Sequence, residues 1–235
     1  MAIAQFEGVL AAELPAPDPN SPEQRVMEAA LACIARWGLA KTTLDDIARE
    51  AGCSRATVYR LFPGGKQTLI HTVGQHEVVR LLALVTAEVT DAAGLEDVIA
   101  RAMHTAGKFI ADNAPLAMLI RHEPEVLLPF LAFDQLGPVL ELTSEFLSPH
   151  LTPYVDRTTA EETCQWAARI VLSYSFIPLD GIDLTDIDVV RTLVRQTMLP
   201  GIEVAARQAG RPVAALQVAS QISQATPTAH QGALQ

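Results

Sequence analysis

The chain has 235 residues, 49% of them hydrophobic, which is enough to bury a sizeable core. No apolar stretch approaches the roughly 20 residues that a membrane-spanning helix needs, and the first residues lack the basic start and cleavage site of a secretory signal. The three cysteines are widely scattered, without the spacing of metal ligands. We therefore expect a cytoplasmic protein that makes no membrane contact and holds neither a metal nor a cofactor.

The net charge of −10 is distributed unevenly along the chain. Residues 21–66 carry seven basic and five acidic side chains, a net of +2, whereas residues 1–20 carry −3 and residues 67–235 carry −9. Phosphate would repel the acidic body, so a nucleic acid would approach the one basic segment. This excess of base is modest and favours DNA binding without establishing it.

The first 20 residues are predicted to be an N-terminal extension that ends in a proline-rich linker. A helix is then expected from Pro22, because Ser21 can cap it, proline suits its first position and Gln24 completes a capping box. Its apolar residues recur at offsets of 3, 4, 7, 8 and 11 from the first, which predicts one buried stripe that ends at Gly38.

Two shorter helices follow. Thr43 can cap the first, with Asp46 in the reciprocal position, and Gly52 closes it after barely two turns. Ser54 begins the second, which we expect to run to about Phe62. Two short capped helices joined by a three-residue turn have the layout of a helix-turn-helix.

The remainder of the chain is predicted to be helical, with no alternating strand pattern. Glycine and proline break the chain before Lys66, where a long helix to about Thr90 begins. The further helices are expected near 95–112, 115–122, 125–147, 159–177 and 186–199, with Thr159 capping the fourth of them and Pro200 following the last.

The predicted fold class is therefore all-α, in two domains. A three-helix domain with the helix-turn-helix layout occupies residues 21–66, and a larger helical domain occupies residues 67–208. Residues 209–235 are rich in Ala, Gln, Ser and Thr with little periodicity, so we expect a disordered tail.

The outer face of the helix at 54–62 carries side chains suited to a major groove. With Val58 turned inward, five residues lie on or beside the solvent face: Arg55, Ala56, Thr57, Tyr59 and Arg60. Arginine can pair with guanine through two hydrogen bonds, and the methyl groups of threonine and alanine can contact thymine. Tyr59 and Thr43 can donate to phosphates, and the helix N-terminus at Lys66 also favours a phosphate. Taken singly, each has an ordinary structural explanation, such as packing for the tyrosine.

The stretch from Thr42 to Leu69 resembles the DNA-binding signature of TetR/AcrR-type transcriptional regulators. It reads TTLDDIAREAGCSRATVYRLFPGGKQTL and matches nearly every signature position. The resemblance implies base contacts from residues 55–57, with a contribution from Arg60. It also implies phosphate contacts from Thr43, Tyr59 and Lys66.

That resemblance further implies a sequence-specific regulator that binds a palindromic double-stranded operator as a homodimer. The helices at 159–177 and 186–199 would pair with their copies. The second of these carries an apolar stripe, for which packing inside one chain is the alternative: Ile187, Val190, Val194, Thr197 and Met198.

The chain departs from the signature in three places. Cys53 stands where valine is usual, which leaves open a redox role for its thiol. Two glycines precede Lys66 where one residue is common, so the reach of that ammonium group is open. The N-terminal arm is acidic, so we predict no minor-groove contact from it.

The helices between about 95 and 147 are expected to enclose a site for a hydrophobic effector such as an acyl chain, a sterol-like molecule or a lipophilic drug. The candidate lining residues, for each of which ordinary core packing is the alternative, are Met103, His104, Ile110, Met118, Phe130, Phe133 and Tyr174. Because the helix from Lys66 belongs to both domains, a ligand that displaces it would move the DNA reader. Recognition helices must match successive major-groove turns, roughly 34–36 Å apart, so this movement would release DNA.

Three other functions compete with that of a repressor. An enzyme is disfavoured because the chain has no glycine-rich phosphate loop, no His-Glu-x-x-His and no Gly-x-Ser-x-Gly. A protein-binding adaptor with this fold is favoured slightly by the acidic body and opposed by the intact set of Arg55, Thr57, Tyr59 and Lys66. An activator would use the same DNA-binding parts, and repression is preferred because most relatives of this type repress.

Overall fold

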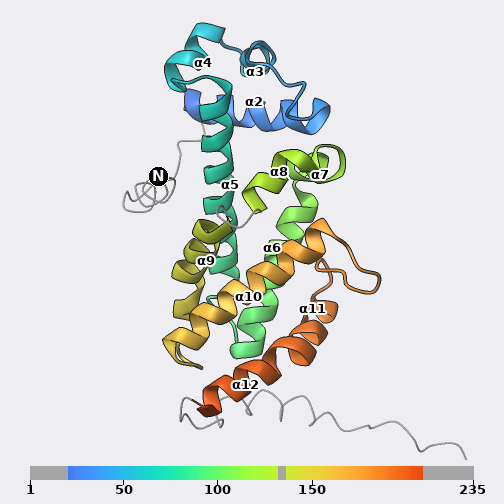
Figure 1. Ribbon diagram of the computed structural model, residues 1–235. Helices are drawn as coiled ribbons and strands as arrows, with labels where there is room; N and C mark the ends of the chain where they lie inside the picture. The colour runs from blue at the N-terminus through green and yellow to red at the C-terminus, as the bar shows by residue number, and fades with distance from the viewer. Residues whose placement is uncertain (1–20, 132–135, 209–235) are drawn as a thin grey trace, which may run out of the picture.

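A computed structural model describes residues 21–131 and 136–208. Over these residues the chain forms helices and no strand, which confirms the all-α class. Helices α2, α3 and α4 lie together at one end of an elongated molecule, and α5 leads from them into a larger helical body (Figure 1). Within the described ranges, no helix is both long and apolar enough to cross a membrane.

The small N-terminal unit consists of α2 (Pro22–Trp37), α3 (Leu44–Glu50) and α4 (Arg55–Leu61). Thr43 and Asp46 form the reciprocal capping box expected at the start of α3, with both N–H···O distances at 3.2 Å. Ser21 caps α2 by accepting from the Gln24 amide at 3.0 Å. The Gln24 side chain donates instead to Glu28, so the second half of that predicted box is not formed.

The N-terminal unit has its own core. The apolar stripe of α2 meets Ile47 of α3 and Val58 of α4, and both side chains are fully buried. Leu69 and Val73, in the first two turns of α5, complete the cluster. The start of α5 is therefore packed as part of the N-terminal unit, while its later turns belong to the body.

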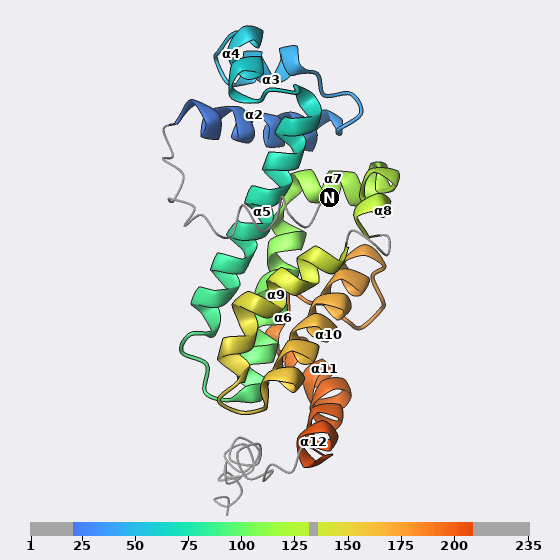
Figure 2. The ribbon, with the colours of Figure 1, turned by 60° about the vertical axis from the view of Figure 1, so that its left-hand side comes forward.

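The body is built from eight further helices: α5 (Lys66–Val89), α6 (Leu95–Asp112), α7 (Ala114–His122), α8 (Pro124–Leu131), α9 (Leu136–Leu151), α10 (Arg157–Phe176), α11 (Ile187–Leu193) and α12 (Leu199–Gln208), with a π-helical turn η1 (Val194–Met198) between the last two within the described ranges. Helices α5, α6, α9 and α10 pack side by side, and α7 and α8 lie between this bundle and the N-terminal unit (Figure 2). Two ion pairs tie the C-terminal helices to α6: Arg191–Asp97 at 2.8 Å and Arg195–Glu96 at 2.7 Å.

Three predicted boundaries in the body are wrong. The single helix expected at 125–147 is two helices, α8 and α9, and α9 continues past Pro149 to Leu151. Buried Ser148 and Leu151 anchor that last turn, so local proline chemistry does not end it. The cap of α10 is Asp156 rather than Thr159, whose amide and hydroxyl both donate to the Asp156 carboxylate.

The third wrong boundary is the helix end expected at Pro200. The chain stays helical from Ile187 to Gln208, because the π-helical turn η1 precedes the proline. A π turn changes the spacing of backbone hydrogen bonds and so accommodates a ring that would clash with the carbonyl four residues earlier. Buried Met198 and Ile202 on either side of Pro200 anchor this segment to the body.

Candidate DNA-binding surface and effector cavity

The outer face of α4 is exposed at the tip of the molecule. Arg55, Ala56, Tyr59 and Arg60 are all exposed, and Thr57 is half-buried beside Ser54, with their hydroxyl oxygens 2.9 Å apart. Buried Val58 fixes which face of this short helix turns outward. The structure thus brings together on one surface the five α4 residues that the sequence indicated.

Arg55 is engaged within the chain. Its guanidinium group contacts the Asp45 carboxylate on α3 at 2.9 Å and donates to the Tyr59 hydroxyl at 3.4 Å. Both carboxylate and guanidinium are more than half exposed, so this ion pair contributes little stability. Arg55 can therefore exchange Asp45 for a DNA acceptor at small cost.

The other two predicted contact residues, Thr43 and Lys66, lie at the starts of helices. Thr43 is exposed at the start of α3, where its hydroxyl also contacts Asp46. Lys66 begins α5 and is half-buried, because its ammonium group donates to the Leu39 carbonyl oxygen at 2.6 Å. An ammonium group has three N–H donors, so two of them remain for another acceptor.

The same peptide segment is held from the body by Glu123, a residue that the sequence did not single out. Glu123 follows α7 and is 9% exposed. Its carboxylate accepts from the Leu39 amide at 2.7 Å and from the Ala40 amide at 3.1 Å. We refer to Lys66, the peptide of Leu39 and Glu123 together as the Leu39 clamp.

The Leu39 clamp requires the glycine that ends α2. A Cβ atom on Gly38 would lie 2.2 Å from the Glu123 Oε1 atom, and the backbone φ of +81° is one that L-residues rarely adopt. Glu123 thus fits against the α2–α3 loop only because residue 38 has no side chain. The one sequence signal for this contact was Gly38 itself, which marks a special backbone position without naming its partner.

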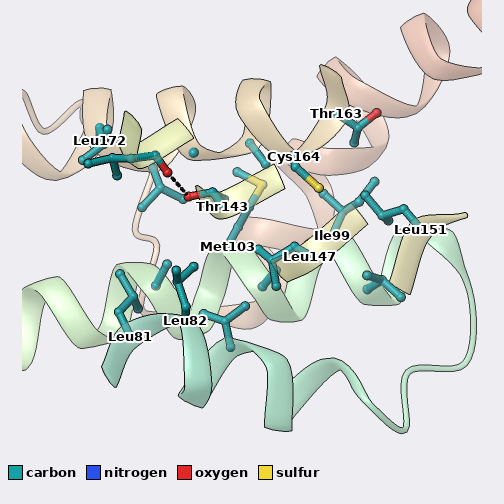
Figure 3. A pocket seen from close by; sticks show the side chains of 18 of the residues that line it. Leu81, Leu82, Ile99, Met103, Thr143, Leu147, Leu151, Thr163, Cys164 and Leu172 are labelled. Carbon is teal, nitrogen blue, oxygen red and sulfur yellow. Dashed lines mark hydrogen bonds between the residues drawn. The ribbon is translucent and has the colours of Figure 1, made fainter. Parts of the chain in front are cut away.

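A cavity of about 110 Å³ lies in the body between α5, α6, α9 and α10. Figure 3 shows side chains of all four helices pointing into it: Leu81, Leu82, Ile99, Met103, Thr143, Leu147, Leu151, Cys164 and Leu172. Sixteen of the nineteen lining residues are hydrocarbon or thioether side chains, and none is charged.

The predicted lining residues divide sharply. Met103 and Ile110 line the cavity, whereas His104, Met118 and Tyr174 do not. The His104 ring turns away and contacts the Leu184 carbonyl oxygen through Nδ1 at 3.2 Å. Phe133 lies outside the described residues, as does the side chain of Phe130.

Sequence reasoning missed the contribution of α5 to the cavity wall, and from α10 it named Tyr174, which is not among the lining residues. Leu82 and Val85 were available as an apolar stripe on the long helix, but periodicity marks a buried face without naming what it faces. Cys164 on α10 also lines the cavity, and burial, with the nearby Glu161 carboxylate, raises the pKa of its thiol to about 12. The thiol is therefore neutral at physiological pH.

The apolar stripe expected to form the dimer interface packs largely inside the chain. Val190, Val194 and Met198 are fully buried in the body core. The opposite side of the C-terminal helices is open: Trp166 on α10 and Val204 on α12 are 39% and 52% exposed.

The geometry above agrees with a known family of DNA-binding proteins. Residues 26–73 match the family described as "Bacterial regulatory proteins, tetR family". This match covers the core of the N-terminal unit, from buried Val26 in α2 to buried Val73 in α5. Residues 26–73 are therefore a DNA-binding domain of the TetR type. The chain is a transcriptional regulator of this type with a helix-turn-helix DNA-binding unit, and such regulators are not enzymes.

Two relatives extend the likeness into the body. An HTH-type transcriptional regulator of Mycobacterium tuberculosis, MT1294, is 27% identical over 194 residues, which cover 80% of this chain and 90% of that protein. The regulator Mb2274c of Mycobacterium bovis is 30% identical over 129 residues, covering 54% of this chain and 64% of its own length.

Solved structures of TetR regulators share the fold. The TetR family repressor AlkX from a Dietzia strain superimposes with a TM-score of 0.58 at 21% identity, covering 78% of this chain and 96% of AlkX. The fatty acid degradation regulator FadR of Bacillus halodurans superimposes with a TM-score of 0.53 at 19% identity, covering 73% of this chain and 93% of FadR. The multidrug binding protein EbrR, solved with imidazole, superimposes with a TM-score of 0.51 at 20% identity, covering 74% of this chain and 87% of EbrR.

Proposed function

We propose that this TetR-type regulator is a cytoplasmic repressor that leaves its operator when a hydrophobic small molecule enters the body. Residues 21–66 read DNA, and residues 67–208 bind the effector and dimerise. The observation that carries this proposal is the separation of two sites: an exposed polar face on α4 and an apolar cavity lined by α5, α6, α9 and α10. The related fold of AlkX, a repressor, and of EbrR, a multidrug binding protein, supports both halves.

On DNA, Arg55, Ala56 and Thr57 contact bases, with Arg60 at the edge of the groove. Thr43, Tyr59 and Lys66 contact phosphates and set the register. A palindromic operator presents two half-sites in successive major grooves, so a second reader is required.

That second reader is supplied by a homodimer formed through the exposed side of α10 and α12. Trp166 and Val204 lie there, and Gly201 lies against the Trp166 ring, so that a Cβ atom on this glycine would be 3.6 Å from the nearest ring carbon. Small and aromatic side chains allow two copies to pack closely. Trp166→Glu should therefore yield monomers in sedimentation, and a dimer that survives this change would place the interface elsewhere.

Effector binding in the cavity is coupled to the position of the DNA-binding unit by two routes. The first is α5, whose Leu82 and Val85 line the cavity and whose Leu69 and Val73 belong to the reader core. The second is the Leu39 clamp, because α7 follows the cavity-lining helix α6 and ends just before Glu123. A ligand that separates α5 from α6 would shift both attachments and favour a state in which the two readers no longer match the operator.

The decisive experiment is a mobility shift on the intergenic DNA upstream of the gene, at stated salt. The double variant Arg55→Ala/Tyr59→Ala should abolish binding that resists competitor DNA, whereas Arg157→Ala, which removes an exposed arginine from the body, should leave it unchanged. Specific binding that survives the double variant would overturn the assignment of the α4 face. A partner protein retained by the double variant, without any operator, would favour the adaptor.

A further inference from the structure

Among the described residues, none of the side chains that line the cavity can neutralise a charge. Nineteen residues of the described chain line it and none is acidic, basic or histidine. The nearest candidate that sequence reasoning offered, His104, contacts the Leu184 carbonyl oxygen and is not part of the wall. A charged ligand group placed here would lose its water without gaining a counter-ion.

The few polar groups in the wall are already engaged or weak. Thr143 donates its hydroxyl hydrogen to the Val139 carbonyl oxygen of its own helix at 2.8 Å (Figure 3). Cys164 contributes a thiol, which is a poor hydrogen-bond donor. The third polar residue is Thr163, which is itself 3% exposed. The wall therefore lacks an obvious strong donor for an anionic oxygen.

This composition distinguishes between ligands of the same length. Burying a hydrocarbon chain is favourable in proportion to its area. Burying a carboxylate or ammonium without a partner is strongly unfavourable, and the group takes up or loses a proton instead. The cavity is also small, because about 110 Å³ is below the roughly 300–1,000 Å³ of pockets that enclose drug-sized ligands.

We propose that the effector is a small, uncharged molecule that is hydrocarbon over the whole part lined by α5, α6, α9 and α10, such as an alkane or alkene. Fatty acids and alkyl amines of equal chain length bind only in their neutral forms. The proposal rests on the proposed function, since it names the ligand class of the same cavity.

The test compares three compounds of equal chain length: octane, 1-octanol and octanoate. Purified full-length protein is titrated with each, and two signals are followed: thermal stability of the protein and anisotropy of labelled operator DNA. Octane should stabilise the protein and release DNA at a concentration at least about tenfold lower than octanoate at neutral pH. The potency of octanoate should rise as pH falls towards the pKa of its acid, while that of octane stays level.

Variants locate the effect in the cavity. Ala106→Leu fills the space from α6 and should weaken the octane response, whereas Ala111→Leu, on an exposed position of the same helix, should not. Thr143→Val removes the wall hydroxyl and should leave octane unchanged. Thr143→Lys supplies a cation and should shift the preference from octane towards octanoate, provided that the variant melts cooperatively.

The outcomes distinguish the ligand class from effector release itself. Stronger release by octanoate than by octane in the unmodified protein would overturn the uncharged class and leave effector-driven release standing. Operator-bound protein that responds to none of the three compounds, nor to any member of a lipophilic panel, would overturn effector release. An octane response that Ala106→Leu leaves intact would place the ligand outside this cavity and overturn the inference.

Discussion

The DNA-reading unit and the body use apolar residues in opposite ways. In the reader, Ile47, Val58 and Leu69 are fully buried in one core, and that core fixes which side chains of α4 face outward. In the body, Met103 and Val171 are also buried, but they line a cavity. Buried apolar residues thus orient an exposed surface in the reader, whereas in the body they surround an unfilled space.

The two regions meet at the Leu39 clamp as well as along α5. In the Leu39 clamp, Glu123 joins the body to the reader, and Lys66 holds the same peptide from within the reader. Both contacts are charge-assisted hydrogen bonds to main-chain atoms, which have defined geometry. If the Leu39 clamp holds the reader to the body, substitutions in the clamp should alter the stability of the chain and the coupling between the two regions. Substitutions at exposed positions of either region should alter them less.

The largest effect is expected from Gly38→Ala. The new Cβ atom would displace the Glu123 carboxylate, and the backbone angles of Gly38, φ +81° and ψ 167°, are nearly exclusive to glycine. Backbone strain of about 1–2 kcal/mol and the loss of charge-assisted hydrogen bonds worth about 1.5–3 kcal/mol should lower the free energy of unfolding by roughly 3 kcal/mol. Urea denaturation measures it.

The control is Gly52→Ala, since Gly52 also has a positive φ but a Cβ there would meet nothing within 4 Å. It should cost only about 1 kcal/mol. Repeating Gly38→Ala in a Glu123→Ala background isolates the clash, and equal costs in both backgrounds would show that Glu123 is not displaced.

Raising the pH should weaken the body through Cys164. Burial, with Glu161 nearby, raises the pKa of this thiol from 9.0 to about 12, so the folded chain keeps a proton that the unfolded chain loses. The stabilisation is complete below about pH 9 and is lost as the pH rises from 9 towards 12. At a pH near 10.5 the loss is on the order of 2 kcal/mol.

Cys164→Ala removes this pH dependence. The free energy of unfolding of the unmodified protein minus that of Cys164→Ala should therefore be independent of pH below about pH 9 and should decrease above it. A difference that stays constant up to pH 11 would mean that the thiol ionises equally in the folded and unfolded states.

The half-buried Cys53 should react with alkylating reagents well before the buried Cys164 does.

Glu123→Ala should uncouple the regions while leaving the reader folded. Operator affinity without effector should change little, but the ratio of affinities with and without effector should fall by about tenfold, within the usual 1–3 kcal/mol of allosteric coupling. Glu125→Ala removes an exposed carboxylate of α8 and is the matched control. An unchanged ratio in Glu123→Ala would assign all coupling to α5.

The smallest effect concerns Lys66. If its two remaining N–H donors reach a phosphate, Lys66→Met should reduce the slope of log affinity against log salt by about one, with a modest loss of affinity. Lys108→Met, which removes an exposed lysine from α6, should change neither. A loss of affinity at unchanged slope would mean that Lys66 acts only by holding Leu39.

Most of the reader was predictable from its sequence because its signals are local. Thr43 and Asp46 lie three residues apart and form the expected capping box, and the apolar spacing of α2 predicted its buried face. Less of the body was predictable. Its helices were expected, but proline did not end α9 or the segment through Pro200, since tertiary packing and a π turn outweighed local chemistry.

The two candidate sites differ in the same way. Consecutive residues of an α-helix point in directions about 100° apart, so one inward residue, Val58, determines which residues of α4 face outward. Sequence alone therefore indicated which residues share this face. The cavity wall requires knowing which of four helices are neighbours. Of the five expected residues whose side chains the structure describes, Met103 and Ile110 are in it. Aromatic residues drew attention, whereas leucine, valine and alanine make the wall.

Sequence by itself determined the helix-turn-helix, its caps and its outward residues, because hydrogen bonds and side-chain periodicity within a few residues decide them. Tertiary structure alone decided the cavity and the Leu39 clamp. Glu123 meets a loop 84 positions earlier, and no local rule pairs a carboxylate with main-chain amides at that distance. Such a contact exists only after the helices have packed, because packing excludes the water that would otherwise satisfy both groups.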